Sequence, residues 1–245
     1  MNKLHYFFRT SIERNNFSNF GVIHLILLGI TLLGMVIIIN KKRENRLFEL
    51  FIGIALSIQQ TTLYLWYLKG NYHFVQEGLP LFHCRIAIIL IAIGMIFKKD
   101  FVMKMGSYWG IFGSISALLF PGLDPFVFPH MTQFSYFIGH ILLLWGSIYL
   151  LTVKKVGMSK SDFKKVFIIT NLYHIAMFNI NNLINSNYAY MKSSPIGIGN
   201  KLNPILYGFI VMMIFNSILS LEYFALNKKK ESVVEECYEM ELIKI

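Results

Sequence analysis

Three side chains with reactive or charged groups stand together at His83, Cys84 and Arg85, in the stretch LPLFHCRIAI (79–88). A cysteine becomes a nucleophile once its thiol is deprotonated, and a nearby histidine can take that proton. An arginine at the edge of an apolar run either reaches out to water or holds an anion such as a phosphate or a carboxylate. The trio therefore predicts thiol chemistry, with His83 or His140 as the base for Cys84.

A zinc site is the main alternative use of these side chains. Its candidate ligands are His83, Cys84, His130 and His140, but their spacings match no standard zinc pattern. We therefore expect no metal and no cofactor. The second cysteine, Cys237, lies in an acidic tail far along the chain, so we expect no disulfide.

The composition says which elements must position these residues. Of 245 residues, 55% are hydrophobic and only 15% are charged, whereas soluble domains carry about 25% charged residues. The apolar residues form long continuous runs, which predicts an all-α polytopic membrane protein with about seven transmembrane helices. The predicted spans cover residues 18–40, 47–68, 79–97, 102–121, 131–153, 165–186 and 204–227. Residues 17–227 would form the seven-helix domain, preceded by a possible amphipathic arm (1–16) at the membrane interface and followed by a cytoplasmic tail (228–245).

The distribution of lysine and arginine predicts the orientation. Sixteen of the 23 fall in the segments 41–46, 98–104 and 154–165 and in the tail. The positive-inside rule then places these segments in the cytoplasm and the amino terminus outside. We expect a multi-pass protein of the cell membrane whose partners are lipids. The net charge of +10 reflects this bias and does not indicate nucleic acid.

The basic residue at the predicted cytoplasmic end of a span serves as a reference point from which the depth of other residues in the membrane can be counted. Cys84, His140, Gln60 and Asn179 each lie fourteen residues from such a residue, or about 21 Å along a helix. In a hydrocarbon core of about 30 Å, all four would share one level near the outer boundary.

Helical spacing adds polar stripes to three of these spans. They include Gln60 and Tyr64 on the second span, Gln133, Tyr136 and His140 on the fifth, and Asn171, His174, Asn181 or Asn182 on the sixth. Unpaired polar groups are costly in lipid, so the stripes should face inward and meet. They would then either hold helices together, at about 0.6–2 kcal/mol per hydrogen bond, or line a functional cavity.

Three stretches resemble a known family: LPLFHC (79–84), FPHMTQFSYFIGH (128–140) and NINNLINSNYAYM (179–191). They resemble the YwaF-like family of bacterial multispanning membrane proteins over roughly the second to seventh spans. That family is distantly similar to eukaryotic transmembrane acyltransferases that remodel ether phospholipids, and to androgen-induced-type membrane hydrolases.

The resemblance implies roles for individual residues. The family cysteine falls on Cys84, its histidine on His140, and its asparagine–tyrosine pair on Asn187 and Tyr188. The family has a histidine two positions before the cysteine, where this chain has Phe82, so the role of the adjacent His83 does not transfer.

Depth and resemblance select the same pair of residues. We therefore expect a membrane-embedded acyltransferase that remodels phospholipid or lysophospholipid in the outer leaflet through an acyl group on Cys84, with His140 as base. The supporting or substrate-binding candidates are His83, Arg85, Gln60, Tyr136, Asn181, Asn182, Asn187 and Tyr188. A lipid hydrolase uses the same groups. The alternative from a different class is a transporter or lipid-binding protein that uses the same cavity without catalysis.

Overall fold

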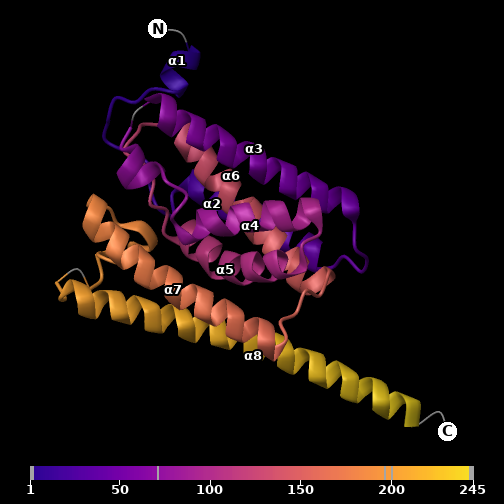
Figure 1. Ribbon diagram of the computed structural model, residues 1–245. Helices are drawn as coiled ribbons and strands as arrows, with labels where there is room; N and C mark the ends of the chain where they lie inside the picture. Colours follow the sequence, from indigo (N-terminus) through magenta and orange to yellow (C-terminus); the bar gives the residue numbers. More distant parts are fainter. Residues whose placement is uncertain (1–2, 71, 196, 200, 243–245) are drawn as a thin grey trace.

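All the regular secondary structure of the described residues is helical. The computed structural model describes residues 3–70, 72–195, 197–199 and 201–242, with residues 228–242 described by their backbone alone. The elements are α1 (Lys3–Phe7), α2 (Val22–Ile39), α3 (Arg46–Gly70), the π-turn η1 (Phe74–Gly78), α4 (His83–Phe97), α5 (Asp100–Leu119), α6 (Met131–Ile148), the π-turn η2 (Tyr149–Val153), α7 (Lys160–Ile184), the 3-10 turn η3 (Tyr188–Tyr190) and α8 (Pro204–Leu242) (Figure 1).

Each predicted apolar run overlaps one of the helices from α2 to α8. Four helical stretches are long and apolar enough to cross a membrane: Val22–Ile39, Arg46–Gly70, Met131–Val153 and Pro204–Asn227. The helix α4 is apolar but shorter. The last helix does not stop at the predicted boundary of the tail, because α8 runs on through residue 242.

Local signals explain several helix ends. Ser159 and Asp162 form a capping box at the start of α7, in which each side chain accepts a hydrogen bond from the other residue's backbone N–H. The helices α4 and α7 end at Lys98 and Asn185, both in the left-handed conformation that commonly closes a helix. The connection between α4 and α5 is therefore only two residues long.

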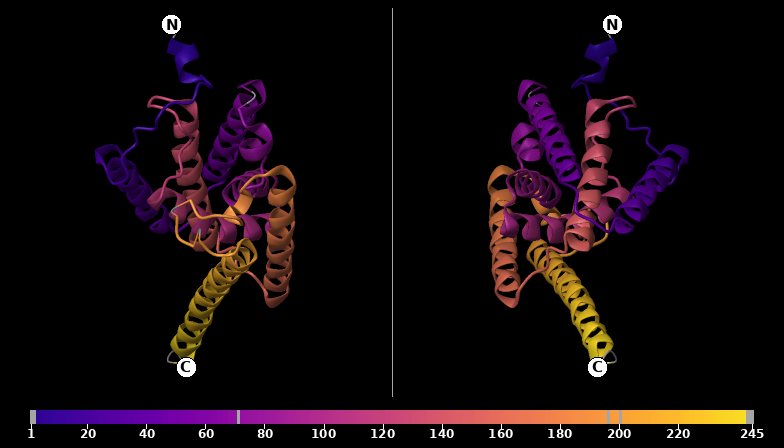
Figure 2. Two further views of the ribbon diagram at one scale, coloured as in Figure 1. Left: turned by 90° about the vertical axis from the view of Figure 1, so that its left-hand side faces the viewer. Right: turned by 90° about the vertical axis from the view of Figure 1, so that its right-hand side faces the viewer.

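The helix α6 forms the centre of the molecule. In the most apolar 18-residue stretch of Met131–Val153, 72% of the residues are buried. The corresponding share for α2, at the periphery, is 17%. The helices α3, α4 and α5 pack around it, while α7 and α8 form a pair on one flank (Figures 1 and 2). Side chains on α6 are therefore held on several sides by neighbouring helices.

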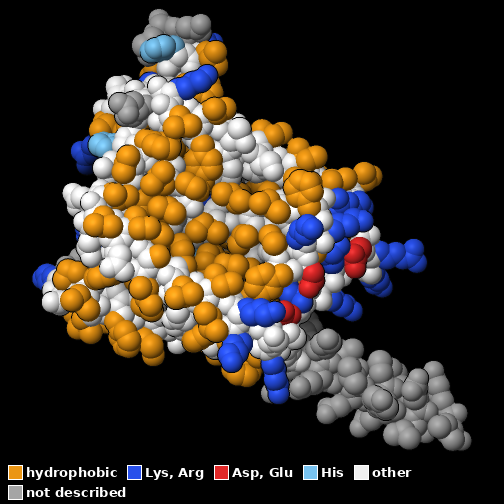
Figure 3. Space-filling view, in the orientation of Figure 1, with side chains coloured by type: hydrophobic (Ala, Val, Ile, Leu, Met, Phe, Trp, Pro, Cys, Tyr) orange, Lys and Arg blue, Asp and Glu red, His pale blue; other side chains and the backbone are white. Residues whose placement is uncertain are grey.

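The surface divides by residue type. Hydrophobic side chains cover the middle of the face seen in Figure 3, and lysines and arginines gather toward the end from which α8 leaves. The amino terminus lies at the opposite end (Figure 1). An apolar belt of this kind is what a bilayer requires of a spanning protein.

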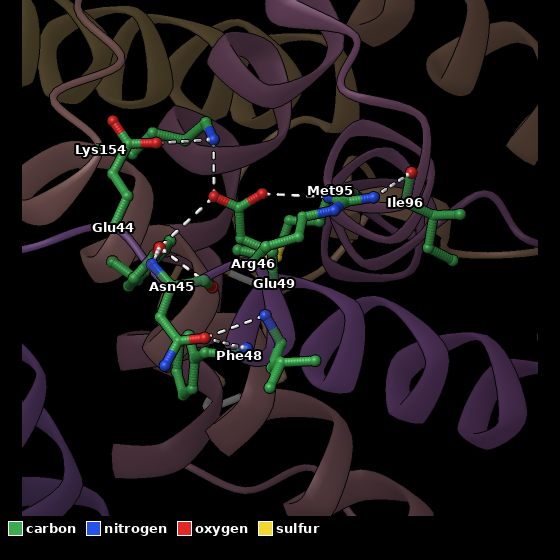
Figure 4. Close-up of polar contacts among 10 residues, drawn as sticks. Glu44, Asn45, Arg46, Phe48, Glu49, Met95, Ile96 and Lys154 are labelled. Carbon is green, nitrogen blue, oxygen red and sulfur yellow. Dashed lines mark hydrogen bonds and ion pairs between the residues drawn. The ribbon is translucent and has the colours of Figure 1, made fainter.

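A network of paired charges joins the helices at the basic end (Figure 4). Glu49 is only 2% exposed and accepts hydrogen bonds from Lys154 at 2.6 Å and from Arg46 at 3.1 Å. Arg46 also donates to the carbonyl groups of Met95 and Ile96 at the end of α4. We call Glu44, Arg46, Glu49, Tyr149 and Lys154 the inner cluster. It ties α3, α4 and the end of α6 together.

The amino-terminal arm docks on the loop before α6. Arg9 is 6% exposed, and it pairs with Glu13 at 2.7 Å and donates to the carbonyl groups of Val127 and Pro129 at 2.6 and 3.2 Å. His130 contacts the carbonyl oxygen of Arg9 through Nε2 at 2.9 Å. The Arg9 guanidinium lowers the pKa of the Glu13 carboxyl group. This part of the arm is thus fixed to the protein, a contact that its sequence did not indicate.

Candidate functional site

Cys84 lies in the first turn of α4, because the helix begins at His83 and not at residue 79 as predicted. Pro80 lies within a non-helical turn that precedes the helix. The thiol is half-buried, and it lies beside the first backbone N–H groups of the helix. First-turn N–H groups have no partners within their helix, so they attract negative charge.

Four tyrosines from different segments lie within electrostatic range of Cys84: Tyr64, Tyr136, Tyr173 and Tyr190. The helix α5 passes close by at Gly113, where an added Cβ would lie 3.9 Å from the Cβ of Cys84. The Cys84 side chain thus packs against the hydrophobic core and is only partly exposed.

His140 is held in one tautomer. Its Nδ1 lies 2.7 Å from the carbonyl oxygen of Tyr136, and its ring packs on the Tyr136 ring with centroids 4.3 Å apart. A carbonyl oxygen only accepts, so Nδ1 carries the hydrogen and Nε2 keeps a free lone pair. That Nε2 is buried and has no hydrogen-bond partner, which also means that it is not hydrogen-bonded to Cys84. Tyr136 lies near both residues.

Arg85 anchors the segment in front of α4. Its guanidinium donates to the carbonyl groups of Glu77 and Leu79 and to the Tyr67 hydroxyl. Two loop carboxyl groups, Glu77 and Asp124, interact with its charge, and burial raises the pKa of both. The arginine is thus bound by protein oxygens and does not simply reach out to water.

Buried polar atoms without partners mark the same region. Among the described residues, both amide atoms of Gln60 and the Tyr64 hydroxyl lack hydrogen bonds, as does Nε2 of His140. Gln60 is 5% exposed. We call Gln60, Tyr64, Cys84, Arg85, Tyr136 and His140 the outer layer. Buried polar groups are normally satisfied, so unpaired ones here indicate a place for a polar ligand.

His83 faces away from this group toward α7. Its Nε2 lies 2.9 Å from Nε2 of His174, and its ring stacks on Phe215 at 4.1 Å. One imidazole donates to the other across this contact. The structure therefore pairs His83 with His174 and leaves His140 as the histidine beside Tyr136.

The predicted asparagines serve the loop after α7. Asn181 accepts from the N–H of Tyr188 at 2.7 Å and donates to its carbonyl oxygen at 2.8 Å, while Asn187 binds the backbone of Ser193. Tyr188 in turn contacts the N–H of Leu79 and the carbonyl of Val75 through its hydroxyl. These residues hold the segment that leads to Cys84.

Two of the asparagines considered for the layer point elsewhere. Asn182 is exposed, which contradicts its expected place in the polar cavity. Asn179 is exposed as well and bonds to the carbonyl oxygen of Ile175 in its own helix. The phase of α7 turns both side chains outward.

Backbone strain accompanies the loop that carries Tyr190. Ala189 and Tyr190 both have positive φ, at 55° and 52°. Residues other than glycine rarely adopt this conformation, and it persists only where neighbouring contacts enforce it. The hydrogen bonds of Asn181 and Asn187 provide those contacts, and they keep Tyr190 near Cys84.

Within the described part of the chain, no three His, Cys, Asp or Glu side chains form a group that could hold a metal ion. Two of the four residues of the zinc alternative have other partners. His83 pairs with His174, and His130 binds Arg9 and Thr132.

Comparison with models of protein families identifies the family of this chain. The model of the TMEM164 family matches residues 15–221, which is most of the chain. The chain belongs to the TMEM164 family. The match confirms a transmembrane protein family, whereas the YwaF-like resemblance stays a prediction. The TMEM164 match includes the whole outer layer. Comparison with curated proteins and with solved structures finds no significant match to either.

Some residues of the site were not among those predicted. Tyr173 and Tyr190 lie near Cys84, and His174 contacts His83. The stripe of polar residues on the sixth span contains His174, so that signal was present in the sequence. Tyr190 depends on the strained loop, for which the asparagine-rich segment gives no clear pattern.

Proposed function

We propose that this protein is an acyltransferase embedded in the cell membrane, with seven spans, the amino terminus outside, and the outer layer near the external face. Its substrates would be phospholipids or lysophospholipids of the outer leaflet. The observation that carries the proposal is the free Nε2 lone pair of His140, buried beside Tyr136 in the layer that holds the Cys84 thiol.

The chemistry uses two balanced half-reactions. Nε2 of His140 takes the proton of Cys84, and the thiolate attacks the ester carbonyl of a donor lipid. The ester C–O bond breaks, and the departing lipid oxygen takes the proton from His140, which leaves an acyl thioester on Cys84. The hydroxyl of an acceptor lipid then gives its proton to His140 and attacks the thioester, and the thiolate leaves and recovers the proton.

The geometry supports each role. Nucleophile–base hydrogen bonds are often loose without substrate and tighten when it binds, so the absence of a bond between Cys84 and His140 here is compatible with the mechanism. The first-turn N–H groups of α4, where Cys84 lies, would help to stabilise a thiolate once His140 has taken the proton. The unpaired amide of Gln60 is suited to donate to the oxyanion that forms during attack.

Capture of the thioester tests the proposal. Purified protein in phospholipid nanodiscs is given a phospholipid with a labelled acyl chain. We expect a hydroxylamine-sensitive label on Cys84 that appears in the native protein and in Cys237→Ala, and that is lost in Cys84→Ala. In His140→Gln the label should form much more slowly.

Two outcomes separate the competing functions. Acyl transfer that survives in Cys84→Ala would contradict the nucleophile assignment. Movement of lipid between leaflets that persists in Cys84→Ala, with no thioester in the native protein, would instead support transport or lipid binding at the same layer.

A further inference from the structure

A groove lies on a face of α6 away from His140, between that helix and α2. Its volume is about 590 Å³, within the range of small-molecule sites. The walls are mainly apolar and come from the segment before α2, from α2 itself and from α6; they include Phe17, Ile23, Leu27, Phe134, Phe137 and Ile138. We call this cavity the α2–α6 groove.

The groove has one polar end. Asn16, Ser18 and Gln133 line it where α6 begins, and Ile141 is the lining residue farthest along that helix. Eight residues of helix separate Gln133 from Ile141, or about 12 Å. A polar rim above a deep apolar wall matches the shape of an amphiphile that lies along the membrane normal.

Gln133 determines which amphiphile fits. It is 4% exposed, and its Nε2 donates to the carbonyl oxygen of Phe126 at 2.9 Å. Its Oε1 is buried and has no hydrogen-bond partner in the described part of the protein. That oxygen can be satisfied only by a donor, and leaving it unpaired costs about 1–3 kcal/mol.

We infer that the α2–α6 groove is a binding site for a lysophospholipid, whose single acyl chain lies along α6 and whose free glycerol hydroxyl donates to Oε1 of Gln133. Diacyl phosphatidylcholine has no hydrogen-bond donor and cannot satisfy this oxygen. In a bilayer of phosphatidylcholine, the bulk lipid therefore competes for the groove only through its acyl chains.

The groove is separate from the outer layer. Cys84, Tyr136 and His140 are absent from its lining. Gln133 stands at the border of the two faces of α6, because Tyr136 and His140 follow it at spacings of three and seven, while Phe137 and Ile141 follow at four and eight. Binding in the groove does not depend on the proposed acyl transfer.

Photo-crosslinking tests the site in nanodiscs of diacyl phosphatidylcholine. Two probes carry the same diazirine acyl chain, one on lysophosphatidylcholine and one on diacyl phosphatidylcholine. We expect the lysolipid probe to label the peptide that contains Phe134 and Ile141, and excess unlabelled lysophosphatidylcholine to remove that label. In Gln133→Leu the label should fall about 2- to 12-fold, the value of a hydrogen bond of about 0.5–1.5 kcal/mol.

A groove-filling variant makes the test independent of Gln133. Ile138→Trp keeps the bond between Gln133 and Phe126 but fills the cavity, so the label should disappear. Ile175→Trp is the matched control, because Ile138 and Ile175 are 47% and 51% exposed and Ile175 lies on α7; it should label normally. Equal labelling by both probes, or labelling that persists in Ile138→Trp, would overturn the inference. The same crosslinking experiments are repeated in Cys84→Ala, which cannot form the proposed thioester. Labelling of the groove in that variant tests lysophospholipid binding independently of the acyl-transfer proposal.

Discussion

Glu49 and Gln60 lie on the same helix, about three turns apart, and both are almost fully buried, yet their polar atoms meet different surroundings. Glu49 is surrounded by Lys154, Arg46 and the Tyr149 hydroxyl. Gln60 has no hydrogen-bond partner for either amide atom within the described protein. The inner cluster is complete by itself, while the outer layer leaves polar atoms unpaired.

The difference separates stability from function. A buried charge with all its partners in place ties helices together, and removing one partner leaves the other uncompensated. Buried polar atoms without partners cost folding free energy and contribute only when a ligand arrives. On this basis, substitutions in the inner cluster should lower stability, and substitutions in the outer layer should lower activity.

The largest expected effect is on acyl transfer in Cys84→Ala. Loss of the nucleophile should reduce the rate by about 10³-fold or more, while the free energy of unfolding changes by about 1 kcal/mol or less. Transfer assays and thermal unfolding in the same nanodiscs measure both quantities. Cys237→Ala is the matched control and should keep full activity.

Glu49→Ala tests the other half of the comparison. It leaves Lys154 and Tyr149 without their buried partner, so it should cost about 3–5 kcal/mol of stability, with activity per folded molecule unchanged. Glu44→Gln is the control, because Glu44 pairs with the same lysine but its side chain is 57% exposed; it should cost about 1 kcal/mol or less. Equal losses for the two variants would contradict the assigned role of burial.

Gln60→Leu should sharpen the contrast, because it removes unpaired polar atoms from the outer layer. We expect acyl transfer to fall by about 100-fold, as for loss of an oxyanion donor, while stability stays equal or rises by about 1 kcal/mol. The neighbouring Gln59 donates through Nε2 to Ser135 at 2.6 Å, although its Oε1 has no hydrogen-bond partner among the described residues. Gln59→Leu should therefore lower stability and leave the rate intact, and the same result for both glutamines would remove the distinction.

The smallest effect concerns the docked arm and pH. Nε2–H of His130 donates to Arg9, and its Nδ1 accepts from the N–H of Thr132, so the ring is neutral. Burial lowers the pKa of His130 from 6.5. The stabilising contribution is therefore complete above pH 6.5 and is lost as the pH falls through the lower pKa of the folded state.

Hydrogen exchange measures that effect. After correction for intrinsic rates, protection of residues 8–13 should drop a few-fold between about pH 7.5 and about pH 5. The change should vanish in His130→Gln and persist in His5→Gln, since His5 is exposed. Unchanged protection in the native protein would show that His130 does not control the arm.

The sequence predicted most of the fold, because long apolar runs leave few alternatives to helices. The common level that it predicts for Cys84, His140 and Gln60 within a membrane follows from helical rise alone and stays a prediction. It was wrong about Asn182, because a span with many asparagines has several possible phases. The pairing of His83 with His174 and the docking of Arg9 depend on contacts across about 90 and 120 residues, which periodicity within one helix does not reveal.

The docked arm has a practical consequence for handling the protein. Arg9 holds the carbonyl groups just before α6, so a bulky fusion partner at the amino end would strain the cap of the helix that carries His140. The end of α8 lies at the far side of the molecule (Figure 1). Affinity tags and fluorescent reporters therefore belong behind α8.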